Sequence, residues 1–455
     1  GIWLARMGTR PAEYAVLHAP KLESLAQDIA SQLEGTVPVL CTSGLLPTSQ
    51  TGLCWDAFPS GDPNIKVRID TVRDKHVVLV MNHDTMHLFE QMAVLLFLQR
   101  FNVPHADAEY ARGAWKRSVC DGRYDEASVA SLTVIVPWYR HCQMERTSRW
   151  TLTDQNKWDN GKPDGEFLDV PTAQSFAAML SSLPIPGHRP APPQQLLLVD
   201  IHEYDDLEAT LDATKRWANR KRAYDYVTGT GTYFASGFEH FLKTVLVAQL
   251  TDVASTFIVF PDGGAHRRFY TMVQACVPGI ALANIVFIQK SRVGAEVTQK
   301  EELLYLDAEG VTQTRAGELP DGARVLIADD FTNSGSTLFG AADILKKKTA
   351  PGATVHVAAY VSHIVAKYER GVVAKLVEKL YGEGTALDEF HCTDSVADVA
   401  GWLKQETDAR VAAGAPRKAH VMPLGAMLAA WVTANPLLPL EQAVAQLSVN
   451  SGEIL

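Results

Sequence analysis

Two adjacent acids, Asp329 and Asp330, end the apolar run RVLIADD (324–330) and stand directly before a loop that could bind an anion. The loop consists of Thr332, Asn333, Ser334, Gly335, Ser336 and Thr337. In an open α/β sheet, ligands bind outside the carboxyl ends of the strands. Hydroxyls and backbone N–H groups at a helix start bind anions, and glycine permits a tight turn. The segment therefore predicts carboxylates that bind vicinal sugar hydroxyls beside a loop that binds a phosphate.

Other interpretations of the same stretch stay open. A mononucleotide would suit it as well as a sugar phosphate, and the two acids could simply cap the helix that follows. A Walker A loop is excluded, because no Lys follows a Gly at the required spacing.

Polar residues also follow two other apolar runs. Asp200 and His202 end QLLLVDIH (195–202), and Asp262 follows TFIVF in the segment FPDGGAHRRF (260–269). Residues two apart on a strand point to the same side, so Asp200 and His202 could both face a metal–nucleotide complex. His202 could instead be an ordinary histidine in a loop, and Asp262 could belong to a Pro-Asp-Gly turn.

The pattern of apolar runs predicts an α/β fold. Short β-branched runs recur at 76–82, 132–138, 195–202, 256–262, 284–290, 324–330 and 354–361. Helical patterns lie between some of them, for example at 85–101 and 336–348. Continuous apolar strands that alternate with helices are typical of a mostly parallel sheet covered on both faces.

Composition narrows the class of protein. The 455 residues are 47% hydrophobic and carry a net charge of -10, which argues against nucleic-acid binding. The six cysteines are scattered, as in a reducing compartment, and we expect a cytoplasmic protein. We see no apolar run of about 18 residues and no signal-peptide pattern, so no membrane partner is expected.

The stretch RVLIADDFTNSGSTLFGAA resembles the phosphoribosyl-pyrophosphate (PRPP) loop of type I phosphoribosyltransferases and of ribose-phosphate pyrophosphokinases. LLLVDIHE, FPDGGAHRRF and FIQKSRVG (287–294) resemble further segments of the pyrophosphokinases, so these are the nearer family. The resemblance implies transfer of a diphosphoryl group from ATP to ribose 5-phosphate, with Mg²⁺ as cofactor. It also implies a homo-oligomer whose active site lies near a subunit interface.

The resemblance assigns roles to individual residues. It implies that Lys290 and Arg292 lie on a catalytic loop that closes over the transferring group. The implied ribose 5-phosphate site is Asp329, Asp330 and the loop from Thr332 to Thr337. The implied ATP contacts are Phe58, Gln143, Arg146, His202 and Asp262. The implied metal ligands are Asp200, His202 and Asp262. Phe58 could instead pack in the core.

Some residues depart from the common pattern of that family. Asn333-Ser334 replaces the more usual Asp-Thr, and Gln143 to Arg146 replace the usual Arg-Gln-Asp run. FPDGGAHRRF, KSRVG (290–294) and Met144-Glu145-Arg146 resemble the plant-type class II enzymes, which do not need inorganic phosphate and accept more nucleotide donors. The resemblance to that class therefore gives no reason to expect phosphate activation or ADP inhibition.

The resemblance implies two tandem type I phosphoribosyltransferase-like, Rossmann-like domains. We place them at 1–230 and 231–455, with a possible basic insertion near 207–230 and a last helix that packs back on the first domain. Two other functions are considered. One is a phosphoribosyltransferase that consumes PRPP, and the other is a non-catalytic subunit associated with a synthetase.

A second histidine pattern is a weaker candidate. His83 and His87 are four apart, with Asp84 and Glu90 nearby, so a continuous helix would place both imidazoles on one face, as in zinc sites. The HExxH arrangement is absent, and we do not expect zinc there.

Overall fold

A computed structural model provides the structure of the protein. It describes residues 13–33, 37–38, 40–43, 51–99, 103–104, 124–125, 129–140, 149–154, 158–159, 165–181, 194–202, 231–293 and 296–437. Gln143, Arg146, the basic segment 207–230 and the C-terminal residues 438–455 lie outside the described residues.

The N-terminal half is built on a sheet of six parallel strands in the order β14-β13-β9-β6-β1-β2. Its strands are β1 (Tyr14–His18), β2 (Val37–Pro38), β6 (His76–Val80), β9 (Ser131–Val136), β13 (Gln194–Val199) and β14 (Gly231–Ala235). The helices of this half include α1 (Glu23–Gln32), α2 (Ile69–Val72), α3 (Leu88–Gln99) and α5 (Thr172–Ser181). The sheet thus takes its last strand from just beyond residue 230.

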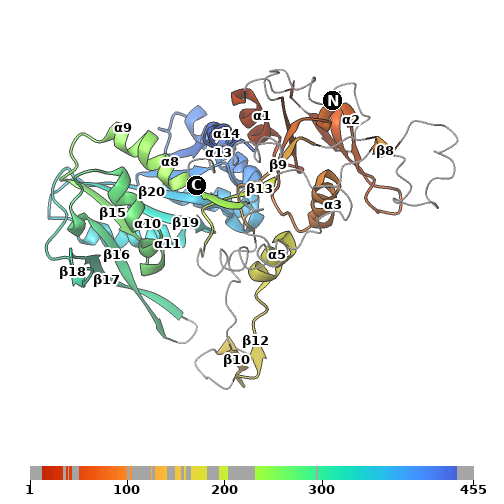
Figure 1. Ribbon diagram of the computed structural model, residues 1–455. Helices are drawn as coiled ribbons and strands as arrows, with labels where there is room; N and C mark the ends of the chain where they lie inside the picture. The colour runs from red at the N-terminus through yellow and green to blue at the C-terminus, as the bar shows by residue number, and fades with distance from the viewer. Residues whose placement is uncertain are drawn as a thin grey trace, which may run out of the picture.

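Three small sheets accompany this half. One contains β3 (Leu40–Ser43), β4 (Thr51–Trp55) and β5 (Lys66–Val67). Another pairs β7 (Val103–Pro104) with β8 (Tyr124–Asp125). The third contains β10 (Arg149–Leu152), β11 (Trp158–Asp159) and β12 (Phe167–Leu168), and it projects from the body of the molecule (Figure 1).

The C-terminal half is built on an eight-stranded sheet in the order β18-β17-β16-β15-β19-β20-β21-β22. Its strands are β15 (Thr256–Phe260), β16 (Ile285–Val293), β17 (Glu296–Leu306), β18 (Thr312–Thr314), β19 (Arg324–Thr332), β20 (His356–Ile364), β21 (Glu389–Thr393) and β22 (Ala419–Met422). The pairs from β16 to β22 are parallel, whereas β16–β17 and β17–β18 are antiparallel. The antiparallel β16–β17 ribbon projects from the sheet (Figure 1).

Helices cover both faces of this second sheet. One face packs against α8 (Gly237–Phe241), the π-helical turn Leu242–Leu246 and α10 (Gly263–Cys276), and the short helix α9 (Val247–Gln249) follows that turn. The other packs against α11 (Ser336–Lys347), α12 (Arg370–Tyr381) and α13 (Ala397–Ala412). Alternate residues of β19 divide between the faces, since Leu326 belongs to one buried cluster and Val325 and Ile327 to the other. Burial on both faces explains the continuous apolar runs.

These elements confirm the predicted α/β fold. Each predicted apolar run is a strand, and the two predicted helices are α3 and α11. One expectation about local structure is wrong: Lys290 and Arg292 do not begin a loop after the strand. They lie within β16, where their backbones pair with Gln299 and Val297 of β17. The polar residues of this segment did not indicate that β16 and β17 form an antiparallel ribbon.

The last described helix, α14 (Gly425–Ala434), packs on α1 of the N-terminal half. Leu424, Leu428 and Val432 share a buried cluster with Leu25 and Ile29. Gly425 allows this close approach, because a Cβ atom there would lie 2.4 Å from the Cβ of Asp28. The C-terminal part of the chain therefore contributes to the core beside the first sheet.

No helix among the described residues is both long enough and apolar enough to cross a membrane.

The close contact at Gly425 makes a stability prediction. We expect Gly425→Ala to lower the free energy of unfolding by about 1–3 kcal/mol, because the added methyl group must push α14 away from the α1 backbone. Urea unfolding followed by tryptophan fluorescence measures the change.

Gly401→Ala is the matched control. Gly401 lies within α13, and a Cβ atom there would meet nothing within 4 Å. This substitution should stabilise the chain by up to about 1 kcal/mol, because alanine favours the helix. Equal effects of the two substitutions would show that α14 does not pack tightly on α1.

Candidate active site between the two sheets

The carboxylate of Asp330 joins the two halves of the chain. It lies at the carboxyl end of β19 and is only 2% exposed. Its Oδ2 lies 2.7 Å from Nδ1 of His202, which follows β13 of the other sheet, and 2.7 Å from Nη1 of Arg268 on α10. Nη2 of Arg268 also donates to the carbonyl oxygen of His202. One carboxylate, one imidazole and one guanidinium thus bring the carboxyl ends of the two sheets together.

The two acids of the pair have different electrostatic surroundings. Burial raises the pKa of Asp329, and the charges of Asp330 and Asp262 raise it further. Burial acts in the same direction on Asp330, but the hydrogen bond from His202 and the charge of Arg268 outweigh it and hold the pKa of Asp330 below its usual range. Asp330 is therefore ionised and fixed by its partners. The ionised form of Asp329 is disfavoured, and a nearby cation or hydroxyl donor would stabilise it.

Asp262 caps helix α10. Its Oδ1 accepts hydrogen bonds from the backbone N–H groups of Gly264 and Ala265, both at 2.9 Å. The Pro-Asp-Gly segment is thus a strand-to-helix turn and not an ordinary β-turn. The effect of Asp262 on the pKa of Asp329 places its charge at the same strand ends. Its predicted part in binding metal and nucleotide stays a prediction.

Asp200 occupies a different environment from the one its predicted role requires. The residue is 0% exposed, and its Oδ2 accepts from the N–H groups of Gly237 and Phe238, at 2.8 and 3.2 Å, and from Oγ of Ser362 at 2.5 Å. The backbone of Asp200 has a φ of +38°. Its carboxylate therefore fixes the start of α8 against β20, and metal binding by Asp200 stays a prediction.

The predicted phosphate loop has the backbone of an anion site. Gly335 has a φ of +76°, and its N–H donates to Oγ1 of Thr332 at 3.2 Å. Helix α11 begins at Ser336, and the hydroxyls of Ser334 and Ser336 lie 3.3 Å apart on exposed residues. Asn333 accepts through Oδ1 from the backbone N–H of Lys367. Hydrogen bonds of Thr332 and Asn333 thus fix the loop, while its two serines are exposed to solvent.

Three residues beside this loop were not predicted. Trp138 follows β9, and its Nε1 donates to the hydroxyl of Tyr368 at 2.8 Å. The guanidinium of Arg140 stacks on the ring of Tyr368, 3.9 Å from its centroid. Tyr368 ends three successive residues with positive φ, 366–368, which is a strained conformation for side chains other than glycine. This second contact also joins the two halves.

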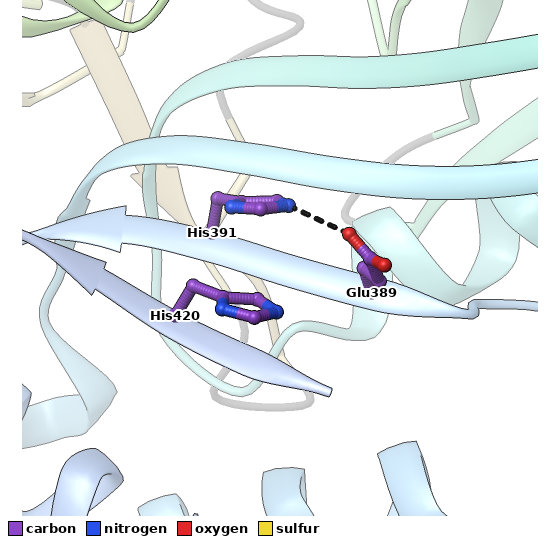
Figure 2. Close-up of side chains that lie close together, drawn as sticks. All are labelled: Glu389, His391 and His420. Atoms are coloured by element: carbon purple, nitrogen blue, oxygen red, sulfur yellow. Dashed lines mark hydrogen bonds and ion pairs between the residues drawn. The ribbon is translucent and has the colours of Figure 1, made fainter. Parts of the chain in front are cut away.

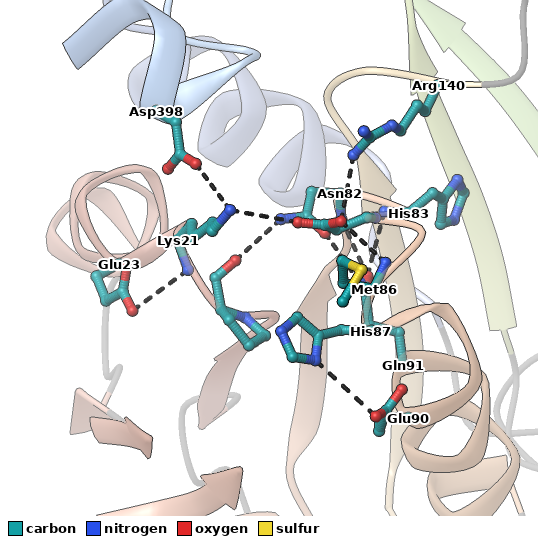
Figure 3. Close-up of polar contacts among 12 residues, drawn as sticks. Lys21, Glu23, Asn82, His83, Met86, His87, Glu90, Gln91, Arg140 and Asp398 are labelled. Carbon is teal, nitrogen blue, oxygen red and sulfur yellow. Dashed lines mark hydrogen bonds and ion pairs between the residues drawn. The ribbon is translucent and has the colours of Figure 1, made fainter. Parts of the chain in front are cut away.

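A network of charged residues extends from Arg140 through the N-terminal half to Asp398 of the C-terminal half, and Figure 3 shows it. Arg140 Nη1 lies 3.3 Å from Asp84, Lys21 lies 3.4 Å from Asp84, and Lys21 also lies 3.0 Å from Asp398 on α13. Burial would raise the pKa of Asp84, but the N–H of Met86 and these two cations lower it. Asp84 thus orients Arg140 beside the strand ends.

The histidines of the NHDTMHLFE segment do not form a common face. Helix α3 begins only at Leu88, and His83 precedes it with a φ of +50°. His83 is buried against Phe176, whereas His87 is exposed and pairs with Glu90 at 3.9 Å. The two imidazoles point in different directions (Figure 3). The i, i+4 spacing therefore does not create a shared metal face here.

Two further predictions concern residues at the margins of the site. Phe58 is 51% exposed in a tight turn where its N–H donates to the carbonyl of Asp62, so packing in the core is excluded. Contact with adenine stays a prediction. The backbones of Lys290 and Arg292 lie in the β16–β17 ribbon next to β15 in the sheet. Their catalytic role also stays a prediction.

Most of the anchoring residues were missed by sequence reasoning. Arg268, Arg140, Trp138 and Tyr368 carry no motif of their own, although Arg268 falls inside the segment FPDGGAHRRF. The sequence signal that could have identified Arg268 is its position on α10, six residues after Asp262, which caps that helix.

Comparison with known proteins shows what this chain is similar to. The phosphoribosyl transferase domain model matches residues 255–380, which include β15, the acid pair and the phosphate loop. Ribose-phosphate pyrophosphokinase 3, chloroplastic, of Oryza sativa subsp. japonica is 25% identical over 351 residues, which are 75% of this chain and 62% of that protein. Ribose-phosphate pyrophosphokinase 4 of Arabidopsis thaliana is 24% identical over 343 residues, with 75% of each chain covered. The chain thus spans about three fifths of the rice protein.

A solved structure shows the same architecture. The phosphoribosylpyrophosphate synthetase from Mycobacterium smegmatis aligns with a TM-score of 0.54 at 16% identity, covering 93% of this chain and 98% of that chain. This likeness supports the fold of two tandem phosphoribosyltransferase-like halves. The chain is therefore similar to ribose-phosphate pyrophosphokinases, and the phosphoribosyl transferase domain model matches within its second half.

Proposed function

We propose that the chain is a ribose-phosphate diphosphokinase that makes PRPP and AMP from ribose 5-phosphate and ATP. The observation that carries the proposal is the junction at Asp330, where His202 of the first half and Arg268 of the second share one carboxylate beside the phosphate loop. A reaction with two substrates needs both of them held in one orientation, and orientation alone can supply about 7–11 kcal/mol. A site assembled from two sheets suits that requirement.

The reaction is a displacement at phosphorus. The 1-hydroxyl oxygen of ribose 5-phosphate forms a bond to the β-phosphorus of ATP, and the bond from that phosphorus to the α,β-bridging oxygen breaks. The hydroxyl proton is released and AMP leaves with the bridging oxygen. Negative charge builds on the transferring group, so nearby cations stabilise the transition state.

We assign ribose 5-phosphate to the carboxyl end of β19. The exposed hydroxyls of Ser334 and Ser336 and the N–H groups that open α11 suit the 5-phosphate. Asp329 is half-buried, and its Oδ1 accepts the N–H of Asp330 at 3.0 Å. It therefore suits the vicinal hydroxyls of the ribose, while Asp330 holds the frame.

We assign ATP to the strand ends of the first sheet. Arg140 and His202 lie there, one held by Asp84 and Tyr368 and the other by Asp330. A guanidinium with a stacked aromatic ring offers fixed donors for a phosphate. Phe58, Gln143 and Arg146 complete the ATP site in this proposal, as the resemblance implies. Lys290 and Arg292, whose backbones lie in the β16–β17 ribbon, are assigned to the transferring group in this proposal.

The residues at the strand ends fit Mg²⁺. The ion prefers oxygen ligands and usually combines one or two carboxylates with substrate phosphates and water. Burial and the charge of Asp330 raise the pKa of Asp329, and the charge of Asp262 adds to this, so a divalent ion would favour the ionised carboxylate. With His202 alongside, Asp329 and Asp262 are the better candidates, whereas Asp200 is fully buried. A bound Mg²⁺ would neutralise part of the negative charge on the phosphates of ATP.

The proposal includes a homo-oligomer in a reducing compartment, which we take to be the cytoplasm. Large apolar side chains of the first half lie exposed among the described residues: Phe58, Met86, Phe89 and Phe97. Such side chains favour contact with a second copy. Chloroplastic and mitochondrial relatives exist among the curated matches.

Phosphorus NMR tests the activity directly. Purified chain with Mg²⁺, ATP and ribose 5-phosphate, in buffer free of inorganic phosphate, should give PRPP signals with an equal amount of AMP. Activity that starts only when phosphate is added would keep the reaction and remove the plant-type class. No reaction in either buffer would contradict the proposal, and turnover of PRPP with a free base would favour a phosphoribosyltransferase.

The ribbon lysine gives a second prediction. Lys290→Ala should lower kcat by at least about 100-fold and leave the affinity for ribose 5-phosphate nearly unchanged, because its charge acts on the transferring group. Initial rates and calorimetric binding of ribose 5-phosphate measure the two effects. Lys375→Ala, on the exposed face of α12, is the control and should change neither. Unchanged turnover in Lys290→Ala would remove this residue from the mechanism.

The shared carboxylate gives a third prediction. Arg268→Lys keeps the charge but loses the planar fork that contacts both Asp330 and His202. We expect kcat/KM to fall by at least about tenfold and the urea midpoint to fall as well.

The neighbouring residue supplies the control for this substitution. Arg267→Lys makes the same arginine-to-lysine change at an exposed position of the same helix. It should leave both kcat/KM and the urea midpoint unchanged. Equal rates for Arg268→Lys and wild type would show that the fork does not align the two halves.

A further inference from the structure

A second group of potential metal ligands lies at the opposite edge of the C-terminal sheet. Glu389 begins β21 and His391 lies at the middle of that strand, while His420 is the second residue of β22. The proposed active site occupies the carboxyl ends, so this group takes no part in the reaction described above. Among the described residues it is the group of three whose ligand atoms all lie within 4.8 Å of one another.

Strand register explains why these side chains meet. His391 is the direct partner of His420 in the parallel β21–β22 pair, and Glu389 lies two residues earlier on the same face of β21. Ala358 of β20 pairs with Glu389, so His356, two residues before Ala358, also lies on this face. The arrangement is therefore a consequence of pairing across three neighbouring strands.

The contacts within the group are short. Nε2 of His391 lies 3.1 Å from Oε2 of Glu389, and Nε2 of His356 lies 3.6 Å from Oε1 of the same carboxylate. The rings of His391 and His420 stack with centroids 4.8 Å apart and an angle of 15° between their planes. Figure 2 shows both of these rings extending along the sheet in the direction of Glu389.

The donor types select a class of metal. Two imidazoles and one carboxylate suit Zn²⁺ and similar divalent transition metals, whereas Mg²⁺ and Ca²⁺ prefer oxygen ligands alone. Zinc bonds of about 2.0–2.1 Å in a tetrahedron bring ligand atoms to about 3.3 Å from one another. The side chains of Glu389 and His356 are 36% and 40% exposed, so they can make that small adjustment.

A small cavity adjoins the group. It measures about 30 Å³ and is lined in part by His356, Glu389 and His391 beneath α8 and the turn that follows it. A cavity of this size admits a water molecule. A fourth ligand, either water or His356, therefore has room.

The charges that face the group are balanced. Glu389 and Asp388 are acidic, and Arg324 and Arg417 are basic. Both arginines have other partners, since Arg324 donates to the carbonyl of Gln249 and Arg417 pairs with Asp408. Their charge weakens cation binding but leaves the ligand atoms accessible. The carboxylate–imidazole pairs already present are the alternative explanation of the group.

We infer that Glu389, His391 and His420 form a zinc-class metal site, with His356 or water as the fourth ligand. The site is structural: it ties β22, the edge strand of the eight-stranded sheet, to β21 and β20. A metal there protects an edge that would otherwise rely on its backbone hydrogen bonds and on the helices above it. It is independent of the proposed diphosphokinase reaction and of the Mg²⁺ in that reaction.

Cobalt binding tests the inference, because Co²⁺ replaces Zn²⁺ and gives visible absorption bands that report tetrahedral nitrogen and oxygen ligands. The full chain, freed of metal with a chelator and held reduced by a phosphine, is titrated with Co²⁺ in excess Mg²⁺. We expect one equivalent of Co²⁺ to bind with tetrahedral geometry and Zn²⁺ to displace it. An absence of tetrahedral bands would overturn the inference.

Variants assign the bands to these residues. His420→Asn and Glu389→Gln should each weaken Co²⁺ binding by at least about tenfold, and each should abolish the rise in melting temperature that Zn²⁺ gives to the wild type. Glu389→Gln retains an oxygen acceptor for His391, so it guards against loss of binding through misfolding. Bands that survive in both variants would place the metal elsewhere and overturn the assignment.

His87→Asn is the matched control. His87 forms a histidine–glutamate pair with Glu90 on α3 but has no second imidazole beside it. Its loss should leave Co²⁺ binding unchanged. A loss equal to that in His420→Asn would show that single histidine–carboxylate pairs account for the binding.

Discussion

The carboxylate of Asp330 is buried between a histidine of one half and an arginine of the other, and much of the structure depends on that contact. A buried charge is costly unless it is paired and hydrogen-bonded, and here the partners come from α10 and from the end of β13. Separation of the halves would leave the acid and Arg268 with fewer partners. The contact therefore favours one relative position of the two sheets, with their carboxyl ends together.

Further polar contacts support the same position. His363 at the end of β20 contacts the carbonyl of Asp200 through Nε2 and Oγ of Ser395 through Nδ1, and Asp200 accepts from Ser362. Burial lowers the pKa of His363, so its ring is neutral and can accept as well as donate. The buried network thus fixes the strand ends behind the site, while the more exposed residues in front of it, such as Asp329 and Ser334, are left to bind ligands.

The predictable part of this structure is the part with a local signal. Burial on both faces produced the apolar runs, so the inner strands of both sheets, such as β6, β9, β15 and β19, could be predicted from the sequence, whereas edge strands such as β2, β18 and β22 were not. The Thr/Ser/Gly loop after Asp330 could be predicted for the same reason, because strand, turn and helix follow one another within a short segment.

The rest depends on contacts between distant segments. Arg268 looks like its neighbour Arg267 in sequence, and only the fold decides which of the two meets Asp330. Arg140 meets Tyr368 from the other half, and His391 meets His420 through strand register. The i, i+4 spacing of His83 and His87 does not correspond to one helix face in the fold, because α3 begins after both of them. The antiparallel pairing of β16 with β17 likewise has no clear local pattern.

A crystal structure with ribose 5-phosphate, Mg²⁺ and α,β-methylene ATP is the most direct test of the central claim, that the two sheets build one site. The methylene group blocks the bond that the proposed reaction breaks, so both substrates persist. The account predicts the 5-phosphate on the loop 332–337, the ribose hydroxyls at Asp329, and the nucleotide phosphates between His202 and that ribose. Nucleotide bound away from the strand ends of the first sheet, or a loop without phosphate, would contradict it.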